Sequence, residues 1–428
     1  MKQMAGRAGN EKAPAGNVVP EAVKREVRER MKELEPAFQA AFRYLHQHPE
    51  LSFQEVETTR YIKKKLLDMG VEVLDIGADT GVVGLLRGGE DGPCIGLRAD
   101  IDALPIQEAS TSPFPSKNDG IMHACGHDVH MTCLLGAAAI LSRLRDQIHG
   151  SVKFIFEPGE EAVTGSRYML DRGVLDNPRV DALFGLHNQP LIPSGTVSVH
   201  SGPLMAGVDR IHLTITGKGG HGGIPQKNRD PIVAASSFIL AAQTIVSRNL
   251  SPLDAAVLSI CYVNAGSSQV SNVTPESVEM AGTVRTFRSE TSAFIEKRLR
   301  TLVEEIAAAF GCEGELEYIH DHPFTYDLPA LVPAAREAVL GCGAQPIDPE
   351  PITASEDFSV FERHVPAYFY WLGTGNEEKD CVYAWHSPHF KADTDILRLG
   401  AGTYALSVFT GIEAVKRGLP DEQDLSKL

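Results

Sequence analysis

The sequence lacks the features of several large classes of protein. Its 428 residues include only seven cysteines, without repeated spacing and without a CxxC pair. An odd, scattered set does not predict a disulfide framework, and the missing CxxC pair argues against a purely structural zinc site. No apolar run reaches the roughly 18 residues that a membrane-spanning helix needs. Positive charge is also scarce: the net charge of −16 argues against nucleic acid and anionic membranes as partners.

The remaining composition is that of a globular protein. Hydrophobic residues make up 43% and charged residues 22% of the chain, and its length predicts two domains. Residues 1–20, rich in Gly, Ala and Pro, have no apolar segment of the kind found in secretory signals, so we expect a disordered arm. The cysteine pattern favours a reducing compartment and therefore a soluble, cytoplasmic protein.

The apolar patterns predict an α/β fold with two kinds of domain. In residues 21–202 and 317–428, short apolar strands alternate with helices, which predicts a mostly parallel sheet with helices on both faces. The first helical pattern runs without interruption from Glu21 to His48. Residues 203–316 follow the order β-α-β-β-α-β, typical of a ferredoxin-like α+β domain. We therefore expect the second domain to be inserted into the first.

One short stretch, from Met122 to His130, concentrates a thiol, three imidazoles and a carboxylate. Cys125 and His127 are two residues apart and would face different sides of a helix, so both reach one metal only if Cys125 precedes the helix. Gly126 permits the necessary turn, and Asp128 is placed to cap the helix. The alternative is a buried structural cysteine beside surface histidines.

Further candidate ligands follow the other predicted strands of the first domain. The C-terminal ends of such strands are where α/β sheets place their sites. One thiolate, three imidazoles and two carboxylates are too many for one structural site and suit two metals with open positions. The mixture favours Zn, Co, Ni or Mn over Mg or Ca. The candidates are Cys125, His127, Glu160, Glu161, His187 and His386.

Two pairs of carboxylates predict a division of roles. Glu160 and Glu161 are adjacent and cannot face one metal in the same way, so we assign Glu161 to the metal and Glu160 to the attacking water as general base. Asp100 and Asp102 follow a buried strand and are candidates for orienting a metal-bound imidazole. Together these parts indicate metal-assisted hydrolysis of an amide. The alternative for the glutamates is a solvated helix start.

The inserted domain has its own polar candidates. His221 lies in a glycine-rich loop that either is simply mobile or brings the imidazole to a substrate. Asn272 and Arg285 are the other candidates, and Arg285 has the geometry to hold a substrate carboxylate with two hydrogen bonds. The alternative for Arg285 is an ordinary surface arginine on a strand.

Eight segments together resemble one known family. Ordered and spaced over about residues 30 to 415, they look like the aminoacylases, hippurate hydrolases and auxin-conjugate (IAA-amino acid) hydrolases. Each segment alone is unspecific, but the combination is specific. The segments are GLRADIDALPIQE, MHACGHDVHMTCLLGAA, EPGEE, FGLHN, GKGGHGGIPQ, SNVTPESVEMAGTVRTF, ASEDF and WHSPHF.

The resemblance implies a dinuclear metallohydrolase that cleaves N-acyl-L-amino acids to a carboxylate and a free amino acid. It implies two divalent ions per subunit, manganese or zinc, with nickel and cobalt as alternatives. Cys125 would lie close to both ions and Glu160 would be the base. The remaining ligands implied are His127, Glu161, His187 and His386.

The resemblance also implies an assembly. In related enzymes the inserted domain pairs two subunits, so we expect a homodimer or homotetramer in which His221 reaches a neighbouring site. Asn272 and Arg285 would contact the substrate. Trp385 stands where many relatives have an aliphatic residue, which would alter the acyl pocket. The segment 355–357 matches the family, but its role does not follow from the sequence.

Two other functions fit the same residues. A dipeptidase or a biosynthetic N-acetyl amino acid deacetylase would use the same chemistry. A catalytically silent ligand-binding homologue is the third reading, and the presence of both Glu160 and His221 argues against it, since a binding protein needs no base.

Overall fold

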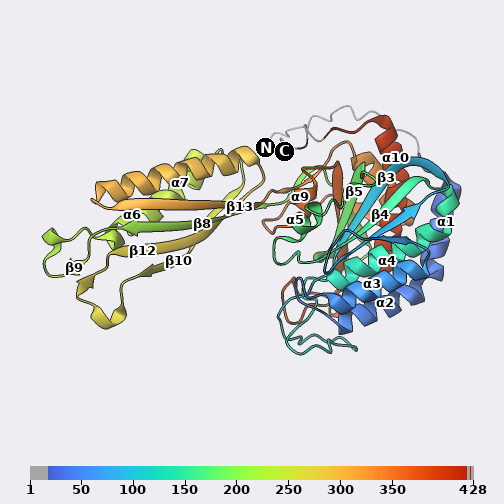
Figure 1. Ribbon diagram of the computed structural model, residues 1–428, viewed down its shortest axis with the longest axis horizontal. Coiled ribbons are helices and arrows are strands. Elements are labelled where there is room, and N and C mark those ends of the chain that lie inside the picture. The colour runs from blue at the N-terminus through green and yellow to red at the C-terminus, as the bar shows by residue number, and fades with distance from the viewer. Residues whose placement is uncertain (1–17, 422–424, 426–428) are drawn as a thin grey trace, which may run out of the picture.

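The computed structural model describes residues 18–421 and Leu425. Most of the arm expected at residues 1–20 therefore lies outside the described residues. Two structural units are evident, a large one that contains both ends of the described chain and a smaller one that projects from it (Figure 1). The smaller unit is formed by one continuous segment, as expected for an insertion.

The large unit is built on an eight-stranded sheet. Its central strands β4, β3, β5 and β16 are parallel, whereas β1, β2 and β6 are antiparallel to their neighbours towards the centre. The mostly parallel sheet is thus confirmed. In spatial order the strands are β1 Glu72–Leu74, β2 Val82–Arg87, β4 His149–Glu157, β3 Glu90–Asp100, β5 Ala182–Pro193, β16 Ala367–Gly375, β6 Thr196–Ser198 and β15 Gln345–Ile347.

Helices cover both faces of this sheet. Six of them share one apolar core with the sheet: α1 Glu21–Glu33, α2 Glu35–Gln47, α3 Val56–Asp68, α4 His127–Arg143, α8 Val332–Cys342 and α10 Leu397–Arg417. The opposite face packs against two short helices, α5 Gly165–Leu170 and α9 Phe358–Phe361. Burial of the central strands on both sides explains their continuous apolar runs.

The smaller unit has the predicted ferredoxin-like topology. Its four antiparallel strands lie in the order β10-β12-β8-β13, and α6 and α7 pack on one face. Ile211, Leu213 and Ile215 on β8 all point into this core, as their alternation predicts. The elements are β8 Gly207–Thr216, α6 Pro231–Thr244, β10 Ala256–Ala265, β12 Ser277–Thr286, α7 Ser289–Ala309 and β13 Glu313–His322. The boundary that we place at residue 316 falls inside β13.

Two pairs of short strands complete the fold. β7 Gly202–Met205 pairs with β14 Thr325–Asp327 where the chain enters and leaves the smaller unit. β9 Gly220–His221 pairs with β11 Val273–Thr274 at the end of the smaller unit that is farthest from the large one (Figure 1).

One expectation about helices needs correction. The uninterrupted helix from Glu21 to His48 is in fact two helices that meet at Leu34, because the ring of Pro36 cannot be accommodated inside a helix. The segment Pro231–Asn249 is long and apolar enough to cross a membrane by length and composition, with 33% of it buried. Polar residues interrupt this segment, so the statement that no apolar run reaches roughly 18 residues holds.

Candidate metal centre

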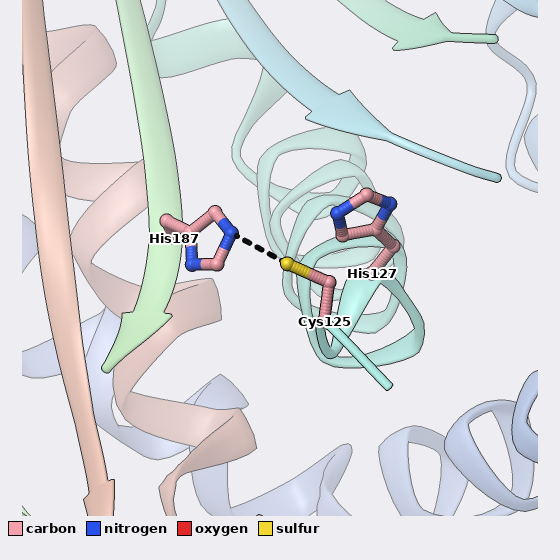
Figure 2. Close-up of side chains that lie close together, drawn as sticks. All are labelled: Cys125, His127 and His187. Carbon is pink, nitrogen blue, oxygen red and sulfur yellow. Dashed lines mark hydrogen bonds between the residues drawn. The ribbon is translucent and has the colours of Figure 1, made fainter. Parts of the chain in front are cut away.

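The predicted ligands converge at the C-terminal ends of the parallel strands. Ligand atoms of Cys125, His127 and His187 lie within 4.8 Å of one another, and those of Cys125, Glu161 and His386 form a second such group. Figure 2 shows Cys125 between the two imidazoles, with its sulfur 3.4 Å from His187 Nε2. The thiol therefore belongs to both groups, which is the arrangement expected of a residue between two ions.

The loop before α4 places the thiol. The helix begins at His127, and Gly126 adopts a left-handed conformation with φ of 91° that directs Cys125 back towards the strand ends. A Cβ atom at Gly126 would lie 2.2 Å from Asn188 Nδ2, which donates a 2.5 Å hydrogen bond to the carbonyl oxygen of Cys125. The prediction that Asp128 caps α4 is wrong. Asp128 lies inside the first turn, and its carboxylate contacts His46.

Hydrogen bonds fix the orientation of the imidazoles. His127 Nδ1 lies 3.2 Å from Asp102 Oδ1, and His187 Nδ1 donates to the carbonyl oxygen of Asn188 at 2.7 Å. Asp102 thus contacts an imidazole of the cluster. Asp100 instead lies 2.6 Å from Nδ1 of His130, whose other nitrogen accepts from the backbone N–H of Asn188.

A buried ion cluster lies behind these groups. Arg98, fully buried, contacts Asp100 at 2.9 Å, Glu157 at 2.5 Å, and Glu356 and Asp357 at 3.0 Å each. One guanidinium therefore faces four carboxylates. This contact shows where the 355–357 segment acts: it supplies two of the carboxylates that surround Arg98.

Negative charge dominates the electrostatics of the site. Glu160 lies within 4.8 Å of both Glu356 and Asp357, and burial followed by the charge of Glu356 raises its pKa well above the usual value. Burial followed by the charge of Glu161 likewise raises the pKa of the Cys125 thiol well above its usual value. A site with this excess of carboxylates is stabilised by cations.

The imidazoles respond in opposite directions. Burial opposes the charged form of His127, but Asp100 and Asp102 outweigh it and raise the pKa of His127 to about 10. Burial, reinforced by His130, lowers the pKa of His187 well below its usual value. His187 is therefore neutral at pH 7 and can donate a nitrogen lone pair, whereas His127 takes up a proton in the absence of another cation.

The residues fit divalent transition-metal ions. His127 Nε2 and Glu161 Oε1 are both buried and without a hydrogen-bond partner, and both face the cluster. Unpaired buried polar atoms are costly, and a coordinated ion satisfies them. A donor set of sulfur, imidazole nitrogen and carboxylate oxygen suits zinc or manganese better than calcium or magnesium.

Comparison with known proteins identifies the family. Residues 96–409 match the family model described as peptidase family M20/M25/M40. The chain belongs to peptidase family M20. An N-acetylcysteine deacetylase of Bacillus subtilis is 44% identical over 87% of this chain and 96% of its own length. An IAA-amino acid hydrolase of Arabidopsis thaliana, ILR1-like 2, is 38% identical over 85% and 82%.

A solved structure gives the same result. The YXEP protein of Bacillus subtilis, described as a dinuclear metal binding peptidase from the M20 family, is 40% identical with a TM-score of 0.80. The superposition covers 90% of this chain and 99% of that one. This M20 chain is thus a metal-dependent amidohydrolase, with clustered candidate ligands for the ions.

The structure does not bring every predicted residue of this M20 protein to the cluster. His221 is exposed on β9, and Asn272 lies beside it, its carbonyl oxygen accepting from Gly222 N at 2.7 Å. Both belong to the end of the smaller unit that is farthest from the large one (Figure 1). Arg285 lies nearer, half-buried, and its Nη1 donates to Ser355 Oγ at 3.1 Å, next to the carboxylates around Arg98.

Sequence reasoning missed several residues of the site. Asn188 hydrogen-bonds to His187 and to the backbone of Cys125, whereas His130 and Arg98 bond to the groups behind the candidate ligands, His130 to Asn188 and both to Asp100. None of these three residues is a predicted site residue. A charged residue inside the apolar strand β3 was a signal for Arg98. His46, near the C-terminal end of α2, is also absent from the predicted residues, and it is buried against Asp128 and Glu108.

Proposed function

We propose that this protein hydrolyses the amide bond of N-acyl-L-amino acids, releasing a carboxylate and a free amino acid. The proposal rests mainly on the position of Glu160. Its Oε2 lies 3.9 Å from His127 Nε2, and its carboxylate lies within 4.8 Å of the ligand atoms of His127 and Glu161. A carboxylate placed beside a metal centre serves as a general base for water. The names of the deacetylase and IAA-amino acid hydrolase relatives support this substrate class.

Each group in the site has a role in this reaction. Cys125, His127, Glu161, His187 and His386 would hold two divalent ions, manganese or zinc. When bound, the ions polarise the amide carbonyl and lower the pKa of water to about 7. Glu160 accepts a proton from the attacking water and delivers it to the leaving nitrogen as the C–N bond breaks. We expect Arg285 to hold the carboxylate of the amino acid.

The test combines one substitution with metal analysis. Glu160→Gln keeps the size and hydrogen-bonding capacity of the side chain but removes the base. We expect normal folding and metal content with kcat on N-acyl amino acids reduced about 10²-fold to 10⁴-fold. Glu161→Gln is the matched control, since loss of a ligand should lower metal content as well as activity. Wild-type turnover by Glu160→Gln would refute the assignment.

A substrate panel separates this function from its alternatives. Acetyl, benzoyl and indoleacetyl amino acids are compared with dipeptides on protein whose bound metals have been counted. Turnover of dipeptides above all acyl amino acids would favour a dipeptidase. Full metal occupancy without any turnover would favour the silent ligand-binding homologue.

We also infer that two subunits pair through the smaller unit. Apolar side chains are exposed on α6 and on the edge strand β10, including Leu240 at 74% and Val263 at 53%. Exposed edges and apolar patches of this kind mark interfaces. Pairing would carry His221 and Asn272 to the partner's site.

We infer separately that the protein works in the cytoplasm. All seven cysteines, each within the described part of the chain, are free, which suits a reducing compartment.

Mixing two inactive variants tests the pairing of the subunits. His221→Ala and Glu160→Gln subunits are unfolded together, refolded and assayed. If His221 acts on the neighbouring site, each heterodimer has one intact site and the mixture recovers up to about a quarter of wild-type activity. No recovery by mixtures in which heterodimers are shown to form would place His221 in its own subunit's site.

A further inference from the structure

Trp385 connects the two groups of candidate ligands. It precedes His386 in the chain, and its ring packs edge-on against the imidazole of His187 with centroids 4.9 Å apart. Its Nε1–H donates to the carbonyl oxygen of Asn188 at 3.1 Å, the same oxygen that accepts from His187 Nδ1. One indole ring thus contacts a ligand of the first group and the acceptor that orients it.

The ligand after Trp385 depends on its backbone for position. The side chain of His386 is 55% exposed, far more than that of Glu161 at 13%, so packing does little to hold it. Its backbone adopts a φ of 63°, a conformation that a non-glycine residue adopts only when its surroundings enforce it. One anchor is the hydrogen bond from His386 N to the carbonyl oxygen of Ala124 at 2.9 Å, which ties this loop to the loop of Cys125.

These contacts assign Trp385 a role of its own: we propose that it is a positioning residue that holds His187 and His386 in register around the shared Cys125. Its ring restricts the rotation of His187, and its N–H fixes the backbone from which His386 projects. The inference rests on the metal centre of the proposed function, but it concerns the binding of the ions rather than the identity of the substrate. Groups that orient metal ligands affect metal affinity directly.

Metal affinity of three variants tests the proposal. Trp385→Leu removes both the ring edge and the N–H, and Trp385→Phe keeps a ring edge but loses the donor. Tyr383→Leu is the matched control, since Tyr383 is exposed in the same loop and its ring packs on His389, which is not a candidate ligand. Dissociation constants for Mn²⁺ and Zn²⁺ are measured by competition with a chelator, without substrate.

We expect Trp385→Leu to weaken at least one ion by about tenfold or more, Trp385→Phe to lie between it and the wild type, and Tyr383→Leu to bind normally. The visible spectrum of the Co²⁺-loaded protein should also change in Trp385→Leu, because it reports ligand geometry. Wild-type affinity and an unchanged spectrum in Trp385→Leu would overturn the proposal. A comparable loss of metal affinity in Tyr383→Leu would also overturn it. The same holds if chelated Trp385→Leu unfolds at a lower temperature and this loss of stability accounts for the weaker binding.

The outcome is separable from that of the proposed function. Weakened ion binding in the Trp385 variants, together with wild-type protein that hydrolyses no N-acyl amino acid, would refute the substrate class and leave the role of Trp385 intact. Wild-type protein that binds neither ion would overturn both.

Discussion

The buried environment of His46 should make the free energy of unfolding depend on pH. Its side chain is 7% exposed, and its two ring nitrogens lie 2.7 Å from Asp128 Oδ2 and 3.3 Å from Glu108 Oε1. Burial opposes the charged imidazole, but the hydrogen bonds with Asp128 and Glu108 outweigh it and raise the pKa of His46 from 6.5 to about 9. The folded protein therefore binds this proton more tightly than the unfolded chain does.

The sign and size of the effect follow from linkage. A pKa raised by folding gives a stabilisation that is complete below the unfolded value of 6.5 and is lost as the pH rises through about 9. At about 1.4 kcal/mol for each pKa unit, the difference corresponds to roughly 3 kcal/mol. For a structural unit of this size, that energy equals a change of roughly 5 °C in Tm.

The assay compares thermal unfolding of chelated wild-type protein and His46→Gln from about pH 6 to about pH 10. The wild type should be more stable at the acid end, and its advantage should shrink by roughly 3 kcal/mol towards the alkaline end. His48→Gln is the control, because His48 lies at the same helix end but bonds the carbonyl oxygen of Tyr44. A difference between wild type and His46→Gln that does not vary with pH would refute the reasoning.

Two further substitutions test the local geometry. Gly126→Ala places a Cβ 2.2 Å from Asn188 Nδ2 at a residue with positive φ, so we expect a lower Tm and reduced metal content. Gly120→Ala is the control, because Gly120 also has a positive φ but no atom lies within 4 Å of the added Cβ. This control measures the backbone strain alone and should keep its metal. Arg98→Met leaves four buried carboxylates without their cation and should cost about 3–5 kcal/mol of unfolding free energy, more at high pH than at low, by urea titration. Equal metal content in the two glycine variants, or a pH-independent loss in Arg98→Met, would contradict these expectations.

The fold was predictable because its signals are local. Alternation on β8 and helical spacing along α3, α4 and α7 lie within single segments, and the order of elements then limits the topology. The break between α1 and α2 at Leu34 was also predictable from the sequence, since Pro36 lies inside the helical pattern. The length of α9 does not follow from a local pattern, because only the four residues Phe358–Phe361 are helical.

The candidate ligands were predictable for a related reason. Parallel strands end at one edge of a sheet, so polar residues that follow successive strands meet whatever the details of packing. The residues that position the ligands have no such rule. His46 and Asp128 are 82 positions apart, and Arg98 and Asp357 are 259 apart. A local interpretation of Asp128 as a helix cap was reasonable, but the buried imidazole of His46 competes for its carboxylate.

His221 and Asn272 are a different case, because the role that we propose for them involves a second chain. Their short strands β9 and β11 pair with each other, so the structure explains how they stay together, and neither reaches the metal ligands of its own chain. Under our proposal both side chains act on a substrate in the site of a second copy. The exposed apolar faces of α6 and β10 are the surface through which we propose that the two copies pair. Recovery of activity in mixed His221→Ala and Glu160→Gln dimers therefore depends on the interface as well as on the chemistry. A charged substitution at Leu240 that prevents pairing should abolish that recovery while leaving the ion affinity of each subunit unchanged.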